Sequence, residues 1–200
     1  MRMPRKIVLA SSNPGKLAEI RAILADLDII VMPQSDFGVR DAEENGLTFA
    51  ENAEIKARHA AAATGLPVIA DDSGLVVDAL DGAPGVHSAR YSGPNASDTT
   101  NIDKLLHELC GVGTAQRGAA FRCVACFVMP DDEEPVLADG EWRGRILEAR
   151  RGAGGFGYDP VFYDPTAGMS AAEMNAGQKN ARSHRGKAFR ALADKLRARR

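Results

Sequence analysis

Short apolar segments alternate with longer amphipathic segments along the chain. Apolar runs over 6–10, 29–32 and 67–70 have the length expected of buried strands. Between them, apolar residues three and four positions apart predict helices over 17–24 and from Thr48 to Thr64. Strands that alternate with helices are typical of an open α/β sheet.

The second half of the chain continues this pattern with longer strands. It predicts a strand over 75–80 and a helix that begins at Ser97 or Asp98 and ends near Cys110. Two segments, 119–129 and 135–148, then predict a hairpin around the acidic residues 131–134. After these strands, Ser183-His184-Arg185-Gly186 opens a C-terminal amphipathic helix.

Two adjacent carboxylates, Asp71 and Asp72, follow the central apolar run and precede Ser73 and Gly74. With the strand ending at Ala70, they lie at its carboxyl end, where open α/β sheets bind ligands. Successive strand residues point to opposite faces, so the two carboxylates are expected to have different roles. The alternative is a surface turn, because Asp, Ser and Gly are common turn formers.

A small polar loop joins the first strand to the first helix, with the residues Ser11-Ser12-Asn13-Pro14-Gly15-Lys16. A strand, a loop and a helix start in this order present backbone N–H groups and a helix dipole to an anion such as phosphate. Lys16 adds a positive charge, although the loop lacks the Walker pattern. Simple N-capping of the helix by Ser or Asn explains the same residues equally well.

Polar residues around the second helix form another group. The segment 34–46 is an acidic loop with Asp41, Glu43 and Glu44, which is typical of a solvated surface. Thr48 and Glu51 have the spacing of a capping box. Asn52 and Lys56 lie four residues apart and therefore share one face of the helix.

Composition narrows the classes of protein that fit. The chain is 44% hydrophobic and 26% charged with a net charge of −2, so nothing in its overall charge favours binding to nucleic acid or membranes. No apolar run has the length of a signal-peptide core or a bilayer span, which predicts a cytoplasmic location. Cys123 and Cys126 have zinc-like spacing, but on a strand their side chains face opposite sides, which favours plain buried thiols.

Taken together, six ordered motifs resemble the inosine triphosphate pyrophosphatase family. They are SSNPGK, LTFAENAEIKA, ADDSG, GAPGVHSARYSG, GGFGYDPVF and SHRGKA, and the resemblance extends from Lys6 to about Leu196. It implies a single domain over 1–200 with an elongated, two-lobed α/β fold, in which helices flank a central twisted mixed sheet and a cleft separates the lobes. It also implies a homodimer.

The activity implied by the resemblance is Mg²⁺-dependent hydrolysis of inosine, deoxyinosine and xanthosine triphosphates to the monophosphate and pyrophosphate. Carried over by position, Glu43 and Asp72 would bind the metal, and Asp72 would be the catalytic base. Substrate contacts would come from the loop and from scattered positions, namely Ser11, Ser12, Asn13, Pro14, Gly15, Lys16, Ser73, Phe156, Gly157, Tyr158, Asp159, Lys179, His184 and Arg185. Supporting positions would be Asp71, Glu51, Asn52 and Lys56.

The residue types agree with this chemistry. Mg²⁺ prefers oxygen ligands and usually keeps several waters, so one or two carboxylates suffice. Cleavage of a triphosphate needs positioning and neutralisation of charge, which Lys16 and Lys56 can provide. Two other classes remain: a nucleotide sensor without turnover, and a binder of single strands that stacks bases on Phe156 and Tyr158. The acidic pair argues against the sensor, and the near-neutral charge argues against the nucleic-acid binder.

Overall fold

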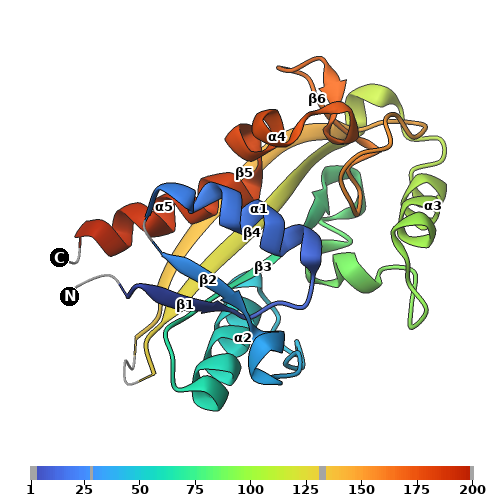
Figure 1. The fold of residues 1–200 in the computed structure, drawn as a ribbon. Helices are drawn as coiled ribbons and strands as arrows, with labels where there is room; N and C mark the ends of the chain where they lie inside the picture. Colours follow the sequence, from blue (N-terminus) through green and yellow to red (C-terminus); the bar gives the residue numbers. More distant parts are fainter. Residues whose placement is uncertain (1–3, 28, 131–133, 199–200) are drawn as a thin grey trace. The chain divides into compact units, whose positions relative to one another are not determined.

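Seven strands form one mixed, open sheet in the computed structural model, which describes residues 4–27, 29–130 and 134–198 (Figure 1). The strand order is β2-β1-β3-β4-β5-β6-β7. The strands are β1 Lys6–Leu9, β2 Ile30–Pro33, β3 Val68–Val77, β4 Gly118–Val128, β5 Val136–Ile146, β6 Phe162–Asp164 and β7 Met169–Ser170. β1 runs parallel to β2 and β3, whereas β6 runs antiparallel to β5 and β7.

Helices accompany the sheet, so the predicted α/β class with a mixed sheet is confirmed. They are α1 Pro14–Ile23, α2 Phe49–Thr64, α3 Asp98–Glu108, α4 Ala176–Arg182 and α5 His184–Ala198. Among the described residues, no helix has both the length and the apolar character needed to cross a membrane. The predicted cleft between two lobes stays a prediction.

The chain divides into two compact units. Unit one consists of 1–72, 123–140 and 184–200, and unit two consists of 73–122 and 141–183. β3, β4 and β5 each contribute residues to both units. The prediction of a single domain over 1–200 therefore stays a prediction.

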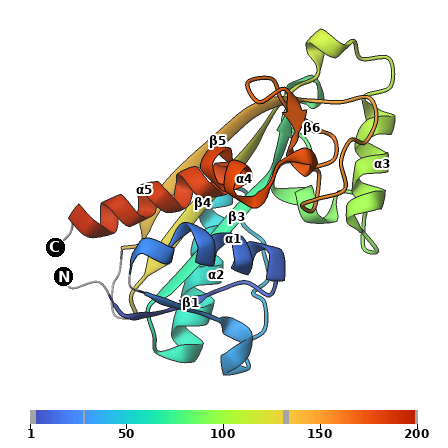
Figure 2. The ribbon, with the colours of Figure 1, turned by 45° about the horizontal axis from the view of Figure 1, so that its top comes forward.

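Unit one has an apolar layer on each face of its strands. On one face, Ile7 and Ile69 belong to a cluster with Ile20 of α1 and Phe189 of α5. α1 and α5 lie side by side on this face in both ribbon views (Figures 1 and 2). On the other face, Val8, Val68 and Ala70 pack with alanines of α2, namely Ala53, Ala57, Ala60 and Ala61.

The small residues of unit one let its helices lie close to the strands. At Gly140 in β5, an added Cβ would lie 2.6 Å from the backbone nitrogen of Ala188 in α5, so only glycine fits there without a shift. This close approach helps to place the first turn of α5, which carries His184 and Arg185.

Unit two has an aromatic core. The ring of Phe162 lies 4.6 Å from that of Phe121 and 4.9 Å from that of Trp142, measured between centroids. The indole N–H of Trp142 donates to the Asp164 carboxylate at 3.0 Å, which satisfies the polar atom of this buried side chain. α3 covers the same cluster with Ile102, Leu105 and Leu109, as the apolar spacing predicted.

The structure corrects one part of the strand prediction. β3 runs without a break from Val68 to Val77, so the break after Ala70 and the separate strand over 75–80 are wrong. Its predicted end, residues 78–80, is a 3-10 turn. The sequence suggested a break because the apolar run ends at Ala70 and two adjacent carboxylates follow it. The strand continues because tertiary contacts offset the cost of burying these carboxylates.

Other predictions are confirmed or extended. β4 and β5 are neighbours joined by a short connection, which makes them the predicted hairpin because a parallel pair needs a much longer crossover. Residues 131–133, which belong to the predicted acidic turn of this hairpin, lie outside the described residues. Cys123 and Cys126 are buried in the two opposite clusters of unit one and are free thiols, as expected. No pattern in the sequence predicted β6, β7 and α4, which are too short to show a clear hydrophobic period.

Candidate active site

The two aspartates of β3 lie just beyond the carboxyl end of β1. β1 pairs with β3 only at Val68 and Ile69, so Asp71 and Asp72 follow directly after the paired region. Both residues are buried, and each contacts cations from different helices. The two aspartates therefore have different environments, and the surface-turn alternative is wrong, whereas the expectation that they have different roles stays a prediction.

Asp71 is held by cations from α1 and α5. Its carboxylate lies 3.1 Å from the Lys16 ammonium, and the Arg185 guanidinium donates to it through Nε and Nη2, each at 3.3 Å. Arg185 also pairs with Glu19 of α1. Burial would raise the pKa of Asp71, but the charges of Lys16 and Arg185 outweigh it and hold that pKa well below its usual range. Asp71 therefore stays ionised and links β3 to α1 and α5 through ion pairs.

Asp72 contacts α2 instead. Its Oδ1 accepts a hydrogen bond from the Lys56 ammonium at 2.8 Å, and Lys56 also lies 2.8 Å from the Glu44 carboxylate. Burial raises the pKa of Asp72, although the Lys56 charge acts in the opposite direction. Three carboxylates, those of Asp72, Asp71 and Glu44, raise the pKa of Lys56 despite its burial. Lys56 therefore stays protonated and bridges β3 to the acidic loop.

The second oxygen of Asp72 suits a metal ligand. Oδ2 is buried and has no hydrogen-bond partner among the described residues. An ionised oxygen in that state is costly unless a cation or a donor reaches it. Within the described ranges, no three His, Cys, Asp or Glu side chains come together as a metal cluster. One or two carboxylates with water complete the coordination that Mg²⁺ usually has in proteins, so the residues fit this ion.

The acidic loop places two neighbouring glutamates differently. Glu44 is half-buried against Lys56, whereas Glu43 is exposed. Metal binding by Glu43 stays a prediction, and Glu44 is a candidate that the sequence analysis missed. Which of two adjacent loop residues faces inward depends on backbone geometry that has no periodic signal in the sequence.

The predicted phosphate loop is shorter than expected, because α1 already begins at Pro14. Asn13 caps the helix, and its Oδ1 accepts from the backbone N–H of Lys16 at 3.1 Å. Ser11 Oγ in turn accepts from the backbone N–H of Asn13 at 3.2 Å. The capping interpretation is thus confirmed, while phosphate binding by the loop, including Ser12 and Gly15, stays a prediction.

Residues at the start of α2 hold the acidic loop. Thr48 caps the helix by accepting from the Glu51 N–H at 3.1 Å. The Glu51 carboxylate accepts from the N–H of Leu47, one residue before the partner expected for a capping box, at 2.6 Å. Asn52 is buried, and its side chain both accepts from and donates to the backbone of Gly46. Their predicted place near metal and phosphates stays a prediction.

Unit two contains Lys179 and the predicted substrate residues of the glycine-rich segment. The Asp159 carboxylate accepts from the Lys179 ammonium at 2.6 Å and from the Phe156 N–H at 2.9 Å. Lys179 also lies 4.5 Å from the centroid of the Phe156 ring. The backbone N–H of Gly157, which has a φ of 59°, donates to Asp98 at 2.6 Å. These contacts fix the glycine-rich segment as one cluster.

Three predicted substrate residues, Tyr158, His184 and Arg185, are buried. Tyr158 lies in the core of unit two, and its hydroxyl donates to the Ser88 carbonyl oxygen at 2.8 Å. In unit one, His184 and Arg185 are buried at the start of α5. Ser73 is half-buried within β3. Substrate contact by these residues stays a prediction.

Comparison with known proteins agrees with the six motifs. The model of the Ham1 family matches residues 7–195. A dITP/XTP pyrophosphatase of Methylococcus capsulatus is 56% identical over 98% of both chains. Another, from Thioalkalivibrio sulfidiphilus, is 54% identical over 97% of this chain and 100% of its own.

Solved structures lead to the same family. A HAM1 protein from Coxiella burnetii has a TM-score of 0.89 and 49% identity, over 98% of this chain and all of its own. The Ham1 protein of Staphylococcus aureus has a TM-score of 0.85 and 42% identity over the same shares. The resemblance inferred from the motifs is confirmed, and the chain belongs to the Ham1 family.

Proposed function

We propose that this protein hydrolyses inosine, deoxyinosine and xanthosine triphosphates to the monophosphate and pyrophosphate with Mg²⁺. The curated relatives named dITP/XTP pyrophosphatase support the substrate class. The observation that supports the chemistry most directly is Asp72, which combines a buried oxygen that has no partner among the described residues with a raised pKa. The proposal includes a cytoplasmic location, where nucleoside triphosphates are polymerised.

Asp72 is the group proposed to act on water. A water molecule attacks the α-phosphorus, its proton passes to the Asp72 carboxylate, and the bond from this phosphorus to the bridging oxygen breaks to release pyrophosphate. A carboxylate whose pKa is raised by burial is a stronger base than an exposed one. Bound Mg²⁺ would neutralise charge on the phosphates.

Two lysines are proposed to neutralise the negative charge of the substrate phosphates. Lys16 and Lys56 already lie on Asp71 and Asp72, so both ammonium groups are positioned before substrate arrives. Positioning in advance avoids part of the reorganisation cost during the reaction. The start of α1 adds the positive end of a helix dipole, which favours an anion.

The cluster of Phe156, Asp159 and Lys179 is proposed to bind the base. Phe156 is half-buried and offers a ring face, while Lys179 can donate but not accept a hydrogen bond. A 6-keto oxygen satisfies such a donor, whereas the 6-amino group of adenine does not. Arg185 is also among the predicted substrate contacts. Its contacts with Asp71 and Glu19 support a positioning role instead.

The test of the function is pyrophosphate release with Mg²⁺ from inosine and adenosine triphosphates. We expect kcat/KM to be roughly 10⁴-fold higher for inosine triphosphate, because sites built on such hydrogen bonds reject analogues that leave them unpaired. A nucleotide sensor would bind without releasing pyrophosphate. Equal efficiency on both nucleotides would contradict the proposed selectivity.

The two aspartates are expected to respond differently to removal of their charge. Asp72→Asn should lower kcat by about 10²–10⁴-fold, the usual cost of losing a general base, with little change in melting temperature. Asp71→Asn leaves Lys16 and Arg185 without their shared anion and should cost roughly 3–5 kcal/mol of unfolding free energy. Chemical denaturation and turnover assays on both variants make the comparison. Near-normal turnover of Asp72→Asn at saturating Mg²⁺ would show that another group is the base.

The paired variants Glu43→Gln and Glu44→Gln test which glutamate assists the metal. We propose Glu44, because it shares Lys56 with Asp72, whereas the Glu43 side chain is exposed. Glu44→Gln should raise the Mg²⁺ concentration for half-maximal activity about tenfold or more, the scale of one lost charged contact. Glu43→Gln should leave it nearly unchanged. The reverse result would restore Glu43 as the ligand.

The protein is also proposed to be a homodimer built from one functional domain per chain. The match to one family model over residues 7–195 supports a single domain, and family resemblance suggests the dimer. Light scattering at micromolar concentration should give about twice the chain mass of 21.3 kDa. A fully active monomer would rule the dimer out as a requirement for activity.

A further inference from the structure

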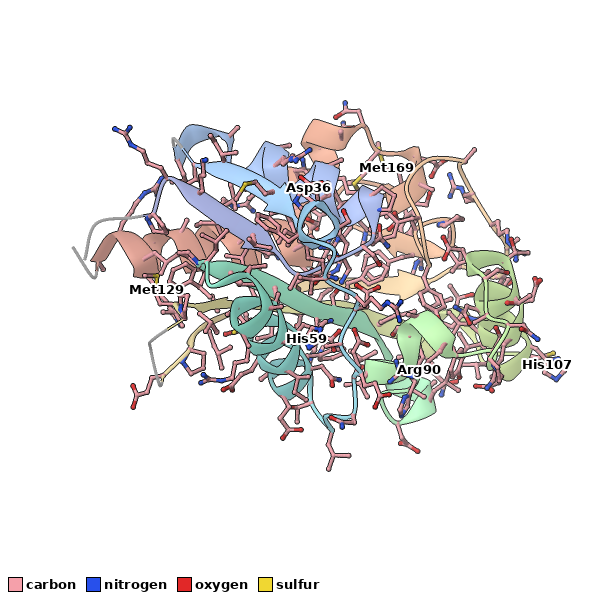
Figure 3. The ribbon with its side chains drawn as sticks, turned by 60° about the horizontal axis from the view of Figure 1, so that its bottom comes forward. Asp36, His59, Arg90, His107, Met129 and Met169 are labelled. Atoms are coloured by element: carbon pink, nitrogen blue, oxygen red, sulfur yellow. The ribbon has the colours of Figure 1, made fainter. Side chains whose placement is uncertain are left out.

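The acidic loop, predicted over 34–46, spans residues 38–48 in the structure, because residues 34–37 form a 3-10 turn and α2 begins at Phe49. It carries both candidate glutamates. Figure 3 follows this part of the chain from Asp36 towards α2, where His59 is labelled. The end of the loop near α2 is held by Asn52 and Glu51, and its middle by Lys56. The His59 ring lies 3.0 Å from the carbonyl oxygen of Arg40. A further attachment is made by Asp41.

Asp41 binds two segments at once. Its Oδ2 accepts from the Ser12 hydroxyl at 2.5 Å, and its Oδ1 accepts from the side-chain amide of Gln34 at 2.5 Å. Ser12 follows β1 and Gln34 follows β2, two parallel strands whose last residues, Leu9 and Pro33, are paired. The carboxylate therefore joins the acidic loop to the carboxyl ends of both strands. It is the same edge at which Asp71 and Asp72 lie relative to β1.

We propose that Asp41 is a positioning residue for the metal-binding carboxylates. By holding Ser12 and the acidic loop together, it sets the separation between the start of α1 and the Glu44–Lys56–Asp72 group. The inference rests on the proposed function, because it gives the Ser12–Asp41 contact a role in metal and phosphate binding. Asp41 is not itself a metal ligand in this proposal.

The fold explains why this attachment matters. Gln34 is buried, so its amide is a fixed donor, and Ser12 is anchored between β1 and the cap of α1. Without Asp41, the part of the loop between Val39 and Glu44 keeps fewer contacts. Metal binding must then also order this segment, which weakens binding without altering the groups that do the chemistry.

The contacts of Asp41 with Ser12 and Gln34 are called the tether below. Hydrogen exchange of the protein without metal or nucleotide tests this tether independently of activity. The N–H of Val39 donates to the Gln34 carbonyl oxygen at 3.3 Å and reports opening of the loop. Ser12→Ala should speed its exchange by roughly 5- to 30-fold, the scale of one lost charge-assisted hydrogen bond, and Asp41→Ala, which removes two such bonds, should speed it at least as much. Both variants should leave α2 unchanged. Asp36→Ala is the matched control, since Asp36 is exposed and makes no side-chain hydrogen bond within the described ranges. Unchanged exchange in Asp41→Ala would overturn the proposal.

Kinetics test the positioning role itself. Asp41→Ala should raise the Mg²⁺ concentration for half-maximal activity about 5- to 30-fold, while kcat at saturating Mg²⁺ and the melting temperature change little. Asp41→Asn should recover most of the loss, because Asn can accept from Ser12 while Gln34 turns its amide oxygen to the new NH₂ group. A loss confined to kcat, or an equal effect in Asp36→Ala, would overturn the proposal. Inactive wild-type protein would refute the proposed function, whereas the exchange result would still decide on the tether.

Discussion

Two neighbouring buried carboxylates on one continuous strand are the constraint on which the rest of unit one depends. Asp71 and Asp72 face opposite sides of β3, so each needs cations from a different layer. The cost of burying an unpaired carboxylate exceeds what the local strand geometry can offset. Cations must therefore come from both layers, and the helices that carry them must lie close to the sheet.

The placement of three helices follows from that requirement. α1 supplies Lys16 and α5 supplies Arg185 on the side of Asp71, and α2 supplies Lys56 on the side of Asp72. Small residues make the close approach possible, with Gly140 beneath α5 and alanines along α2. The two sides differ in how the charge is shared. Asp71 is enclosed by Lys16 and Arg185, whereas Asp72 shares the single ammonium group of Lys56 with Glu44.

This difference connects packing with chemistry. The enclosed carboxylate has a lowered pKa and serves as a structural anion, while the other has a raised pKa and suits proton transfer and metal binding. Unit two has a similar arrangement, because the Asp159 carboxylate accepts hydrogen bonds from both the Lys179 ammonium and the backbone N–H of Phe156. In both units, a buried carboxylate holds cationic side chains in place: Asp71 holds Lys16 and Arg185, and Asp159 holds Lys179.

The sequence by itself determined the types of the longer helices and strands, the burial of Cys123 and Cys126 and the family, because hydrophobic periods and ordered motifs are local signals. It also indicated that Asp71 and Asp72 face different ways, since strand alternation is local as well. Only the tertiary structure decided that β3 continues through both aspartates, because the compensating charges lie on helices far away in sequence. The same holds for Glu44 and Asp41. Their orientation depends on long-range contacts with Lys56, Ser12 and Gln34, which no local pattern encodes.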